Sequence, residues 1–433
     1  MLKLWSAIGL FLSFEAMNQD VVLADQYHYN NIIVGDRAMG LGGAYTAISD
    51  DASGVVYNPA GLGFALSNDI SGSANAFYRK RVEYKKIIGD NSYVETSTGL
   101  FNPFFGGLQK LDNISNGLVF AFGLYSSDAE LKDQDDLISA PELGIVRFHR
   151  SANIRASTNY FGVALGKRFG KGFSGGIGLN ALWVNELTQI YQDSVQGPIV
   201  QNGVTYYSLL TRADRQELDV QGFEPVLGLQ WAPTDKLSIG LSFKKALLIK
   251  DTLKISQEQT SVAVDDPNTG ITALNDISRV PVTSEIEDAI KTWPSETRLG
   301  FAYFASSRMM FSFDAVHRSA TDGEFKLLDR NSVVNYALGS EIYVTTSVPI
   351  RLGFFTNNDA RPEIDRSRGS QDDHLDYKGA SVFVGWVQPN SQISVGTILQ
   401  QGKGEAQKIS GSTNVQDVVA LSTTFGISAT HNF

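Results

Sequence analysis

Most of this chain alternates between apolar and polar residues. In residues 236–243 (KLSIGLSF) every second residue is apolar, and the residues between them are Ser or Gly. A period of two places alternate side chains on opposite faces of a β-strand. The same pattern recurs at residues 160–169, 174–184, 298–305, 309–316, 350–355 and 419–433. The polar positions are rich in Gly, Ser, Asn, Lys and Arg, which a packed sandwich core would not accept, so we expect one face to contact lipid and the other water.

The connections between these strands are alternately short and long. Short turns are expected at about residues 111–116, 169–173, 232–236, 305–308, 346–349 and 388–391. Long polar segments lie near residues 81–96, 127–155, 188–214, 250–293, 319–331, 357–376 and 402–416. This alternation is typical of outer-membrane barrels, whose short turns lie at one end and whose long loops lie at the other. We therefore predict an all-β fold, a transmembrane antiparallel β-barrel of about fourteen strands with long extracellular loops.

The first residues have the pattern of a secretory signal peptide. Lys3 precedes an apolar run at residues 4–14 that is too short to span a bilayer, and residues 22–24 (VLA) fit a small-residue cleavage site. We expect residues 1–24 to be this signal. A buried N-terminal helix is the alternative, but acidic Glu15 follows the apolar run at once and no amphipathic period continues.

The segment between this signal and the first expected strand, at about residues 68–78, has no place in a barrel wall. Its sequence over residues 35–62, GDRAMGLGGAYTAISDDASGVVYNPAGL, is too apolar for a disordered tail, while Gly and Pro allow compact turns. We expect residues 25–66 to form a hatch that plugs the lumen, and residues 67–433 to form the barrel. The hatch and gate residues singled out are Gly40, Gly42, Gly43, Asp50, Asp51, Asn58, Pro59, Ala60 and Gly61.

The end of this segment, NPAGL, is expected to be a movable joint. Pro59 fixes its own backbone angle and biases Asn58 away from helix, Asn58 can bond nearby backbone, and Gly61 can adopt angles closed to other residues. Asp50 and Asp51 could bind a metal or act as an acid–base pair, but capping and turn formation is the favoured interpretation. The glycines at 40 and 42 lack the preceding strand and following helix of a dinucleotide loop.

The same residues carry a family resemblance. AMGLGGAYTAISDDASGVVYNPAGL, residues 38–62, resembles the N-terminal hatch of the FadL family of outer-membrane transporters for long-chain fatty acids and related hydrophobic compounds. Residues 293–317 and 348–362 are similar to late barrel strands of that family. The resemblance implies a fourteen-stranded barrel closed by a hatch, an external apolar site, an interior pocket, and sideways exit through the wall. Smaller barrels associated with secretion or surface proteins carry a similar hatch.

Cations in the lumen-facing phase are candidates for holding a ligand carboxylate. Lys244, Arg298 and Arg351 each fall in the polar phase of their strands. Asp314 and Glu341 share that phase, so the alternative is that these charges pair with one another inside the barrel.

A second set of candidates lies in the long segment at residues 250–293. Within SEIEDAIKTW, residues 284–293, the apolar Ile286, Ile290 and Trp293 have helical spacing. They predict an apolar ligand-collecting groove or, alternatively, a packed loop.

Composition narrows the remaining function classes. The chain has no Cys, which excludes disulfides and thiolate chemistry, and its net charge of −10 disfavours a nucleic-acid binder. The five His show no zinc spacing, and no nucleophile elbow is present. Residues 265–276 could wrap calcium, but a solvated acidic loop is favoured. We expect no enzyme activity, no catalytic residues, no cofactor and no metal.

The C-terminal strand completes the prediction. Phe433 ends a strand in which alternate residues are mostly apolar, and this ending resembles the assembly signal of outer-membrane barrels. We expect a multi-pass protein of the outer membrane of a Gram-negative-type bacterium. Its expected partners are the barrel-assembly machinery, outer-membrane lipid and a hydrophobic small molecule, with no nucleic acid. The predicted function is passive uptake of long-chain fatty acids or other hydrophobic compounds; a structural or secretion-associated barrel is the alternative, and the apolar plug argues against a general porin.

Overall fold

The structure is a computed structural model. It describes residues 27–29, 31–99, 102–141, 144–201, 204–265, 275–324, 328–368, 371, 373–408 and 413–433. The predicted signal peptide, residues 1–24, lies outside the described residues, as does most of the candidate calcium loop at residues 265–276.

The described chain is dominated by one antiparallel sheet. Its strands are β1 Asp69–Ile88, β2 Asn91–Gly99, β3 Asn102–Lys110, β4 Leu118–Ala140, β5 Ile145–Phe169, β6 Phe173–Gln201, β7 Val204–Thr234, β8 Leu237–Lys244, β9 Leu247–Asp265, β10 Asn275–Glu287, β11 Glu296–Ser306, β12 Met309–Arg318, β13 Val333–Thr345, β14 Val348–Asn357, β15 His374–Gln388, β16 Ser391–Ala406 and β17 Gln416–Asn432. Strand β17 pairs with β1 from Asn432↔Asp69 to Val418↔Tyr84, which closes the sheet.

Three of the barrel strands are interrupted. Strands β2 and β3 both pair with β1, and β8 and β9 both pair with β7. Strands β10 and β11 pair with β9 and β8 in turn. The two pieces β2 and β3 therefore form one barrel strand, as do β8 and β9, and β10 and β11. The sheet is a closed fourteen-stranded antiparallel barrel, which confirms the predicted fold class.

The turns lie where the sequence predicts them, but several expected loops are strand. The connections at residues 111–117, 170–172, 235–236, 307–308, 346–347 and 389–390 are short. Strands β4 and β5 have 23 and 25 residues, and β6 and β7 have 29 and 31. The predicted loops at 127–155 and 188–214 are therefore wrong, because these residues continue the wall. A membrane crossing needs only about 9–11 strand residues. Beyond the membrane both faces of a strand contact water, so the apolar–polar alternation that marks a strand is lost.

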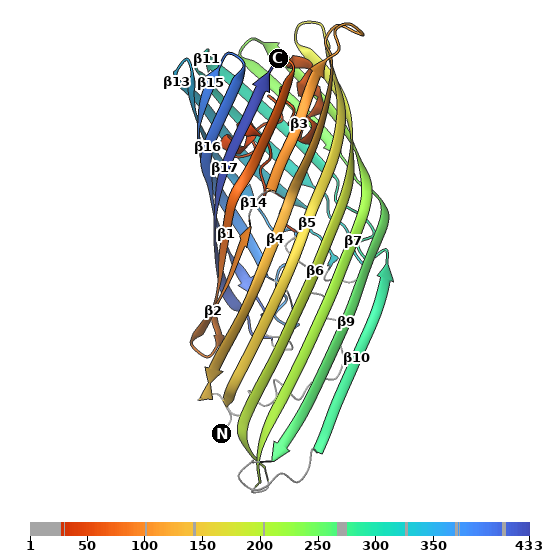
Figure 1. The fold of residues 1–433 in the computed structure, drawn as a ribbon, viewed down its shortest axis with the longest axis vertical. Coiled ribbons are helices and arrows are strands. Elements are labelled where there is room, and N and C mark those ends of the chain that lie inside the picture. The colour runs from red at the N-terminus through yellow and green to blue at the C-terminus, as the bar shows by residue number, and fades with distance from the viewer. Residues whose placement is uncertain are drawn as a thin grey trace.

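This extension makes the barrel asymmetric. Strands β4 to β7, β9 and β10 reach farther than the others at the end opposite the C-terminus (Figure 1). We call the end with the short turns the turn end and the opposite end the loop end. The first strand also extends farther than predicted, over Asp69–Ile88 in place of residues 68–78.

The outer face carries an apolar belt. Large apolar side chains are exposed at alternate positions of many strands, as at Phe161 (46%), Leu227 (58%), Phe354 (61%) and Phe425 (52%). Such a belt is the lipid-facing surface of a membrane barrel. Toward the loop end the outward residues become charged, as at Arg79 in β1. No helix among the described residues has the length and apolar character needed to cross a membrane.

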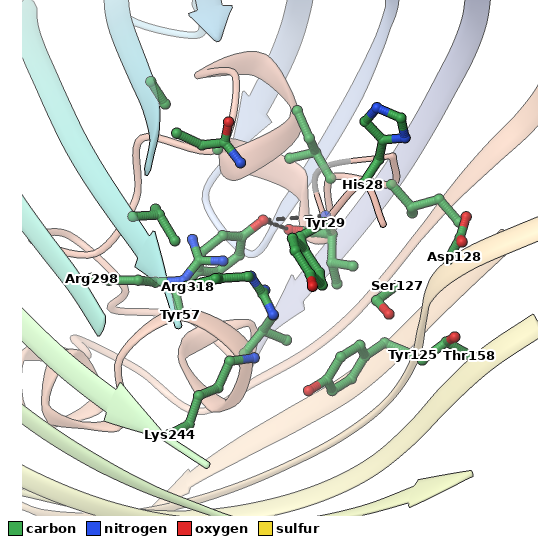
Figure 2. A pocket seen from close by; sticks show the side chains of 18 of the residues that line it. His28, Tyr29, Tyr57, Tyr125, Ser127, Asp128, Thr158, Lys244, Arg298 and Arg318 are labelled. Carbon is green, nitrogen blue, oxygen red and sulfur yellow. Dashed lines mark hydrogen bonds between the residues drawn. The ribbon is translucent and has the colours of Figure 1, made fainter. Parts of the chain in front are cut away.

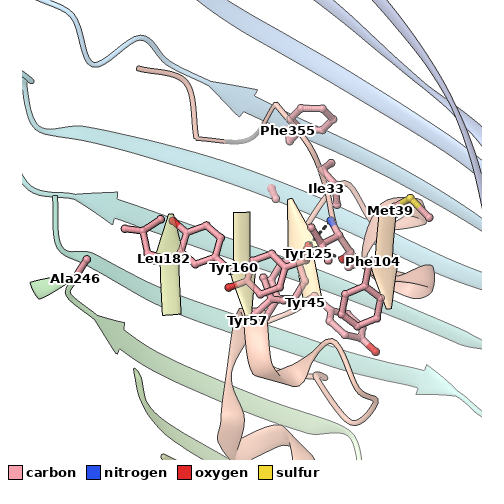
Figure 3. Packing of buried hydrophobic residues seen from close by; sticks show 14 of the residues in the cluster. Ile33, Met39, Tyr45, Tyr57, Phe104, Tyr125, Tyr160, Leu182, Ala246 and Phe355 are labelled. Carbon is pink, nitrogen blue, oxygen red and sulfur yellow. Dashed lines mark hydrogen bonds between the residues drawn. The ribbon is translucent and has the colours of Figure 1, made fainter. Parts of the chain in front are cut away.

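The N-terminal segment lies inside the barrel (Figure 1). It contains helix α2 (Asp36–Gly40), helix α3 (Gly54–Tyr57) and the 3-10 helix η1 (Pro59–Phe64). Its apolar side chains, among them Met39 and Tyr45, pack with Phe104 and Tyr160 of the wall in one buried cluster (Figure 3). The core of the protein is therefore the contact between this segment and the inner face.

Glycines on the inner face allow this contact. At eight wall glycines an added Cβ would lie only 2.2–2.8 Å from an atom of residues 41–60. These positions are Gly162, Gly166, Gly176, Gly228, Gly240, Gly300, Gly339 and Gly353. The expectation that the polar phase contacts water is wrong at these positions, because their backbone touches the N-terminal segment directly.

Candidate functional site

A small cavity lies in the lumen beside the N-terminal segment (Figure 2). Its volume is about 70 Å³. Residues 28–29, 32–34, 42–43 and 56–57 supply one side, and strands β4, β5, β8, β11, β12 and β13 supply the other. Trp293, from the interruption between β10 and β11, also lines it.

Aromatic rings form much of the cavity wall. Tyr125 of β4 and Tyr160 of β5 stack with their ring centroids 4.9 Å apart. Tyr57 of α3 exchanges two hydrogen bonds with Val34: its hydroxyl donates to the Val34 carbonyl at 2.9 Å and accepts from the Val34 N–H at 3.2 Å. The tyrosines thus present apolar faces to the cavity, and Tyr57 ties residue 34 to α3.

Three cations also line the cavity and share one carboxylate. Glu296 of β11, which is 1% exposed, accepts from Arg298 Nε at 2.5 Å and from Arg318 Nη2. Lys244 Nζ lies 3.6 Å from Glu296 and 3.3 Å from Glu224. The structure therefore places Lys244 and Arg298 in the lumen, as the sequence phase indicates, and pairs both with neighbouring carboxylates.

Arg351, the third candidate cation, lies away from this cavity. It is fully buried, and its Nε donates to Glu341 at 2.6 Å while Nη1 donates to Asp36 at 3.3 Å. Asp36 also accepts from Ser428 of β17 and Gln392 of β16. In this structure Arg351 therefore holds the start of α2 against the wall.

Wall side chains hold the rest of the N-terminal segment through its backbone. Asp314 of β12 accepts hydrogen bonds from the backbone N–H of Tyr45 at 3.1 Å and of Thr46 at 3.0 Å. Serines donate to its carbonyls: Ser174 to Ala60, Ser242 to Tyr57, Ser238 to Ala47 and Ser381 to Gly40. The segment from Asp36 onward is thus anchored to strands around the barrel.

The NPAG residues are part of this anchoring. Asn58 is fully buried; its Nδ2 donates to the carbonyls of Thr46 at 2.9 Å and Leu229 at 3.1 Å, and its Oδ1 accepts from Ala60 N. Pro59 occupies the first position of η1. Gly61 does not use the positive φ that is open to glycine, but it packs closely: an added Cβ would lie 2.3 Å from the Ser49 carbonyl oxygen.

The remaining hatch candidates make turns and local bonds. Gly42 and Gly43 have positive φ values of 64° and 86° just after α2, where a residue with a Cβ would be strained. Asp50 accepts from Arg37 at 2.8 Å, and Asp51 accepts from the Ser53 backbone N–H at 2.9 Å. No group of three or more metal-binding side chains occurs among the described residues.

The segment at residues 284–293 is not helical. Its first residues end β10, and residues 288–295 form an irregular interruption in the wall. Positive φ angles at Asp288 (55°) and Lys291 (60°) break any helical path, so the predicted helical spacing is wrong. Ile290 and Trp293 are nonetheless buried, at 2% and 4% exposure, and Ile286 packs against the same cluster.

Sequence reasoning missed several residues of the cavity. Arg318 lies four residues after Asp314 and therefore shares its inward phase, a signal that was available. Glu296 likewise shares the phase of Arg298. Tyr29, whose ring lies 4.1 Å from the Arg318 guanidinium carbon, precedes the recognisable motif and has no such signal.

A second charged cluster lies nearer the loop end, beyond the apolar belt. Glu95 of β2 is 1% exposed and accepts from Lys132 Nζ at 2.7 Å and Arg150 Nη1 at 2.9 Å, and Lys408 Nζ lies 3.3 Å away. Burial alone would raise the pKa of Glu95, but the three cations outweigh burial and hold this pKa well below its usual range. The cluster joins strands β2, β4 and β5 to the segment that follows β16.

Comparison with known proteins identifies the fold. A scan against protein-family models finds no match, and neither does a search of curated proteins. A Pseudomonas aeruginosa FadL homologue matches with a TM-score of 0.61 at 13% identity, covering 92% of this chain and 98% of that one. The Pseudomonas putida toluene transporter TodX matches with 0.62 at 13% identity and the same coverage. The Ralstonia pickettii toluene transporter TbuX matches with 0.53 at 10% identity, again with the same coverage.

At these identities the likeness concerns the fold. It agrees with the FadL-family resemblance that the sequence motifs carry. The chain therefore has the barrel fold that the FadL homologue and the two toluene transporters share.

Proposed function

We propose that this protein is an outer-membrane transporter for the passive uptake of hydrophobic compounds, with long-chain fatty acids among them. The observation that carries the proposal is a lipid-belted closed barrel whose lumen holds a buried N-terminal segment and an aromatic-lined cavity. The FadL homologue and the toluene transporters share this fold. The chain then acts as a channel and not as an enzyme.

Apolar side chains on the inner face support a path for such compounds. Leu182, Val184, Leu218, Val220, Leu253 and Ile255 project inward from β6, β7 and β9 and belong to the same buried cluster as Tyr160 and Trp293. They extend from the cavity toward the loop end. A hydrophobic solute that enters there moves along apolar contacts while leaving water.

In this proposal the N-terminal segment is a hatch that opens to admit ligand. A cavity of about 70 Å³ is too small for the ligand classes proposed, since an apolar cavity of about 150 Å³ holds benzene and ligand pockets span about 300–1,000 Å³. Residues 28–29 and 32–34 form one wall of the cavity, so their displacement enlarges it directly.

In this proposal, sideways exit occurs where the wall is interrupted between β8–β9 and β10–β11. The ladder between the two interrupted strands runs to Lys244↔Glu296 on one side and resumes at Thr252↔Glu287 on the other. Between these pairs, residues 245–251 and 288–295 form no ladder with each other, although residues 247–248 and 250–251 remain paired with β7. Leu247 and Ile249 are 60% and 71% exposed on this seam, and Trp293 lines the cavity behind it. Leaving through the seam keeps an acyl chain in lipid, which preserves about 0.8 kcal/mol per methylene.

The remaining partners follow from the same proposal. Outer-membrane lipid contacts the apolar belt. The barrel-assembly machinery recognises the end of β17, where Phe433 is 64% exposed and its N–H donates to the Asn68 carbonyl beside the start of β1.

A barrel with a structural or secretion-associated role is the second candidate. It is favoured by the length of β6 and β7, which carry the wall far beyond the belt and give a protein partner a large polar surface.

Reconstitution into lipid vesicles tests the proposal. The purified full chain should accelerate transfer of a fluorescent long-chain fatty acid or of a labelled alkylbenzene into the bilayer, relative to protein-free vesicles. A general polar pore would instead pass sugars of similar size. Transfer of neither hydrophobic probe would contradict the transport proposal and favour the second candidate.

A further inference from the structure

An apolar groove lies on the lipid-facing surface near the turn end. Its volume is about 590 Å³, and strands β4 to β8 line it. Leu165, Ile177 and Leu227 are successive cross-strand partners and form its side nearer the loop end. The groove shares no lining residue with the cavity in the lumen. Its volume falls within the range of about 300–1,000 Å³ that is typical of ligand pockets.

The groove is open because Gly175 has no side chain. Gly175 pairs with Lys167 of β5 and Leu229 of β7, so it faces the lipid between two long side chains. An added Cβ there would meet its nearest atom, Cε2 of Phe169, at 3.4 Å, which is contact and not a clash. The next residue, Gly176, faces the lumen, where the N-terminal segment blocks any side chain. A larger residue therefore fits at position 175 but not at 176.

Aromatic side chains mark the membrane interface beside the groove. Phe169, Phe173 and Trp231 are cross-strand partners that lie one residue pair nearer the turns, and they are 52%, 42% and 52% exposed. Aromatic girdles of this kind lie at the level of the lipid head groups. The groove therefore lies at the depth where an acyl chain begins below its head group.

Three cations lie at the end of the groove nearest the turns. The long stem of Lys167 lines the groove, and its Nζ donates to the hydroxyl of Ser115 in the turn between β3 and β4 at 2.9 Å. Two N–H donors of this ammonium remain for another acceptor. Arg168 and Lys171 follow at the turn between β5 and β6, where both side chains are exposed and the Arg168 guanidinium donates to the Lys171 carbonyl. The groove thus joins an apolar floor to a basic end.

Carboxylates do not neutralise this basic end. Within the described chain the three cations form no ion pair, and their contacts are to a hydroxyl, a carbonyl and aromatic rings. Asp112, the acid of the turn between β3 and β4, lies 3.6 Å from Lys110 Nζ and accepts from the Gly117 N–H at 2.9 Å. Asp235 and Lys236 are adjacent in the turn between β7 and β8 and cancel in charge. The charge at the end of the groove is therefore complementary to an anion.

We propose that this groove is a binding site for an anionic glycerophospholipid of the surrounding membrane. One acyl chain lies over Gly175, and the phosphate lies at the basic end, where Lys167 donates to its oxygens. Arg168 and Lys171 supply further positive charge to the head group. Lipid tails are as apolar as the groove, so selectivity comes from the head group and not from the chain. The inference does not depend on what the barrel transports, because the groove faces the membrane.

Native mass spectrometry of the full chain, released from detergent, tests the head-group preference. The probes are dioleoylphosphatidylglycerol and dioleoylphosphatidylcholine, which share their tails and differ in net charge. Wild type should retain one phosphatidylglycerol at least about tenfold more tightly than phosphatidylcholine. Lys167→Gln should reduce this preference about fivefold, the share expected for one cation near an anionic lipid. The control Arg308→Gln, which changes an exposed cation in the turn between β11 and β12, should keep it.

Filling the groove tests its location. Gly175→Leu should assemble normally, as shown by heat-modifiable migration, but lose the retained lipid. The control Ala380→Leu adds the same side chain to the lipid-facing surface of β15, between Phe354 and Leu399, and should retain lipid like wild type.

Three results would overturn the inference. Wild type could retain both lipids equally, or assembled Gly175→Leu could retain phosphatidylglycerol at the wild-type level. A lipid-free dimer that Gly175→Leu disrupts would assign the groove to a contact between two copies of the chain. If Gly175→Leu does not assemble, an unchanged preference in Lys167→Gln overturns the assignment by itself.

Discussion

Two parts of the N-terminal segment lie inside the same barrel but are held very differently. Residues 36–66 touch eight wall glycines and receive side-chain hydrogen bonds from strands around the circumference. Residues 28–29 and 32–34 instead line the cavity, and Val34 is joined to α3 through the Tyr57 hydroxyl. Hydrogen bonds hold this part to strands β4, β14 and β15, at Asp128, Asn357 and Leu375. We call residues 36–66 the seat, because side chains from strands around the circumference hold them, and residues 27–29 and 31–34 the face, because fewer strands hold them. We expect ligand to displace the face first. The seat should move only when its hydrogen bonds to the wall break.

The largest expected effect comes from blocking the seat. Gly176→Leu places a side chain where an added Cβ already lies 2.3 Å from the Pro59 carbonyl carbon. Overpacking against backbone should lower the free energy of unfolding by about 3 kcal/mol or unseat the segment. Denaturant unfolding in detergent measures the first result and bilayer conductance the second.

Gly72→Ala is the matched control for this substitution. A Cβ there meets its nearest atom, the Phe104 carbonyl oxygen, at an ordinary 3.7 Å. If both variants behave like wild type, residues 36–66 do not sit against the glycines.

The NPAG joint should show a smaller effect. Changing Asn58 and Pro59 together to Ala removes three hydrogen bonds of Asn58 and the fixed start of η1. We expect a loss of about 2 kcal/mol with an assembled barrel, and an altered rate of ligand uptake. Heat-modifiable gel migration reports assembly. An unchanged uptake rate in a destabilised barrel would assign the joint to packing alone.

Removing the hydrogen bonds between Tyr57 and Val34 should have a smaller effect still. Tyr57→Phe removes only the hydroxyl that binds Val34, at a cost of about 1 kcal/mol. It should speed uptake, because residues 27–34 become easier to displace. Tyr45→Phe is the control, since that hydroxyl donates to Asp51 within the seat at 2.7 Å. Equal uptake by both variants would contradict the assigned difference between face and seat.

The loop-end cluster should be insensitive to mild acid. The pKa of Glu95 is lowered in the folded protein, so its stabilising effect is present above the ordinary carboxyl pKa and is lost only as pH falls through the folded value. The destabilisation caused by Glu95→Gln should therefore stay constant between about pH 8 and pH 5. Thermal unfolding of both proteins across this range checks it, and a difference that shrinks by pH 5 would contradict the assigned ionisation.

The sequence predicts the wall well where lipid and water impose opposite preferences on the two faces. Turn positions and strand number follow from that period, as at residues 235–236 between β7 and β8. The long extensions do not follow, because residues 188–214 do not alternate regularly between apolar and polar side chains. The alternation along the strand shows that Gly176 faces the lumen. It does not show that the backbone of Pro59 packs against this glycine.

The cavity could be anticipated only in part. Lys244 and Arg298 have the correct phase, yet their pairing with Glu296 depends on the register between β8 and β11. The apolar spacing at residues 284–293 wrongly predicted a helix, because positive φ angles at Asp288 and Lys291 interrupt any helical backbone there.

The central claim is that residues 36–66 close the lumen. Deletion of residues 35–53 removes α2 and the turn held by Asp314, while leaving every strand of the wall. Single-channel recording in planar bilayers should then show stable openings that wild type lacks, from a barrel shown to be folded by heat-modifiable migration. Wild-type conductance in the folded deletion variant would contradict the account, because the segment would not then be what closes the barrel.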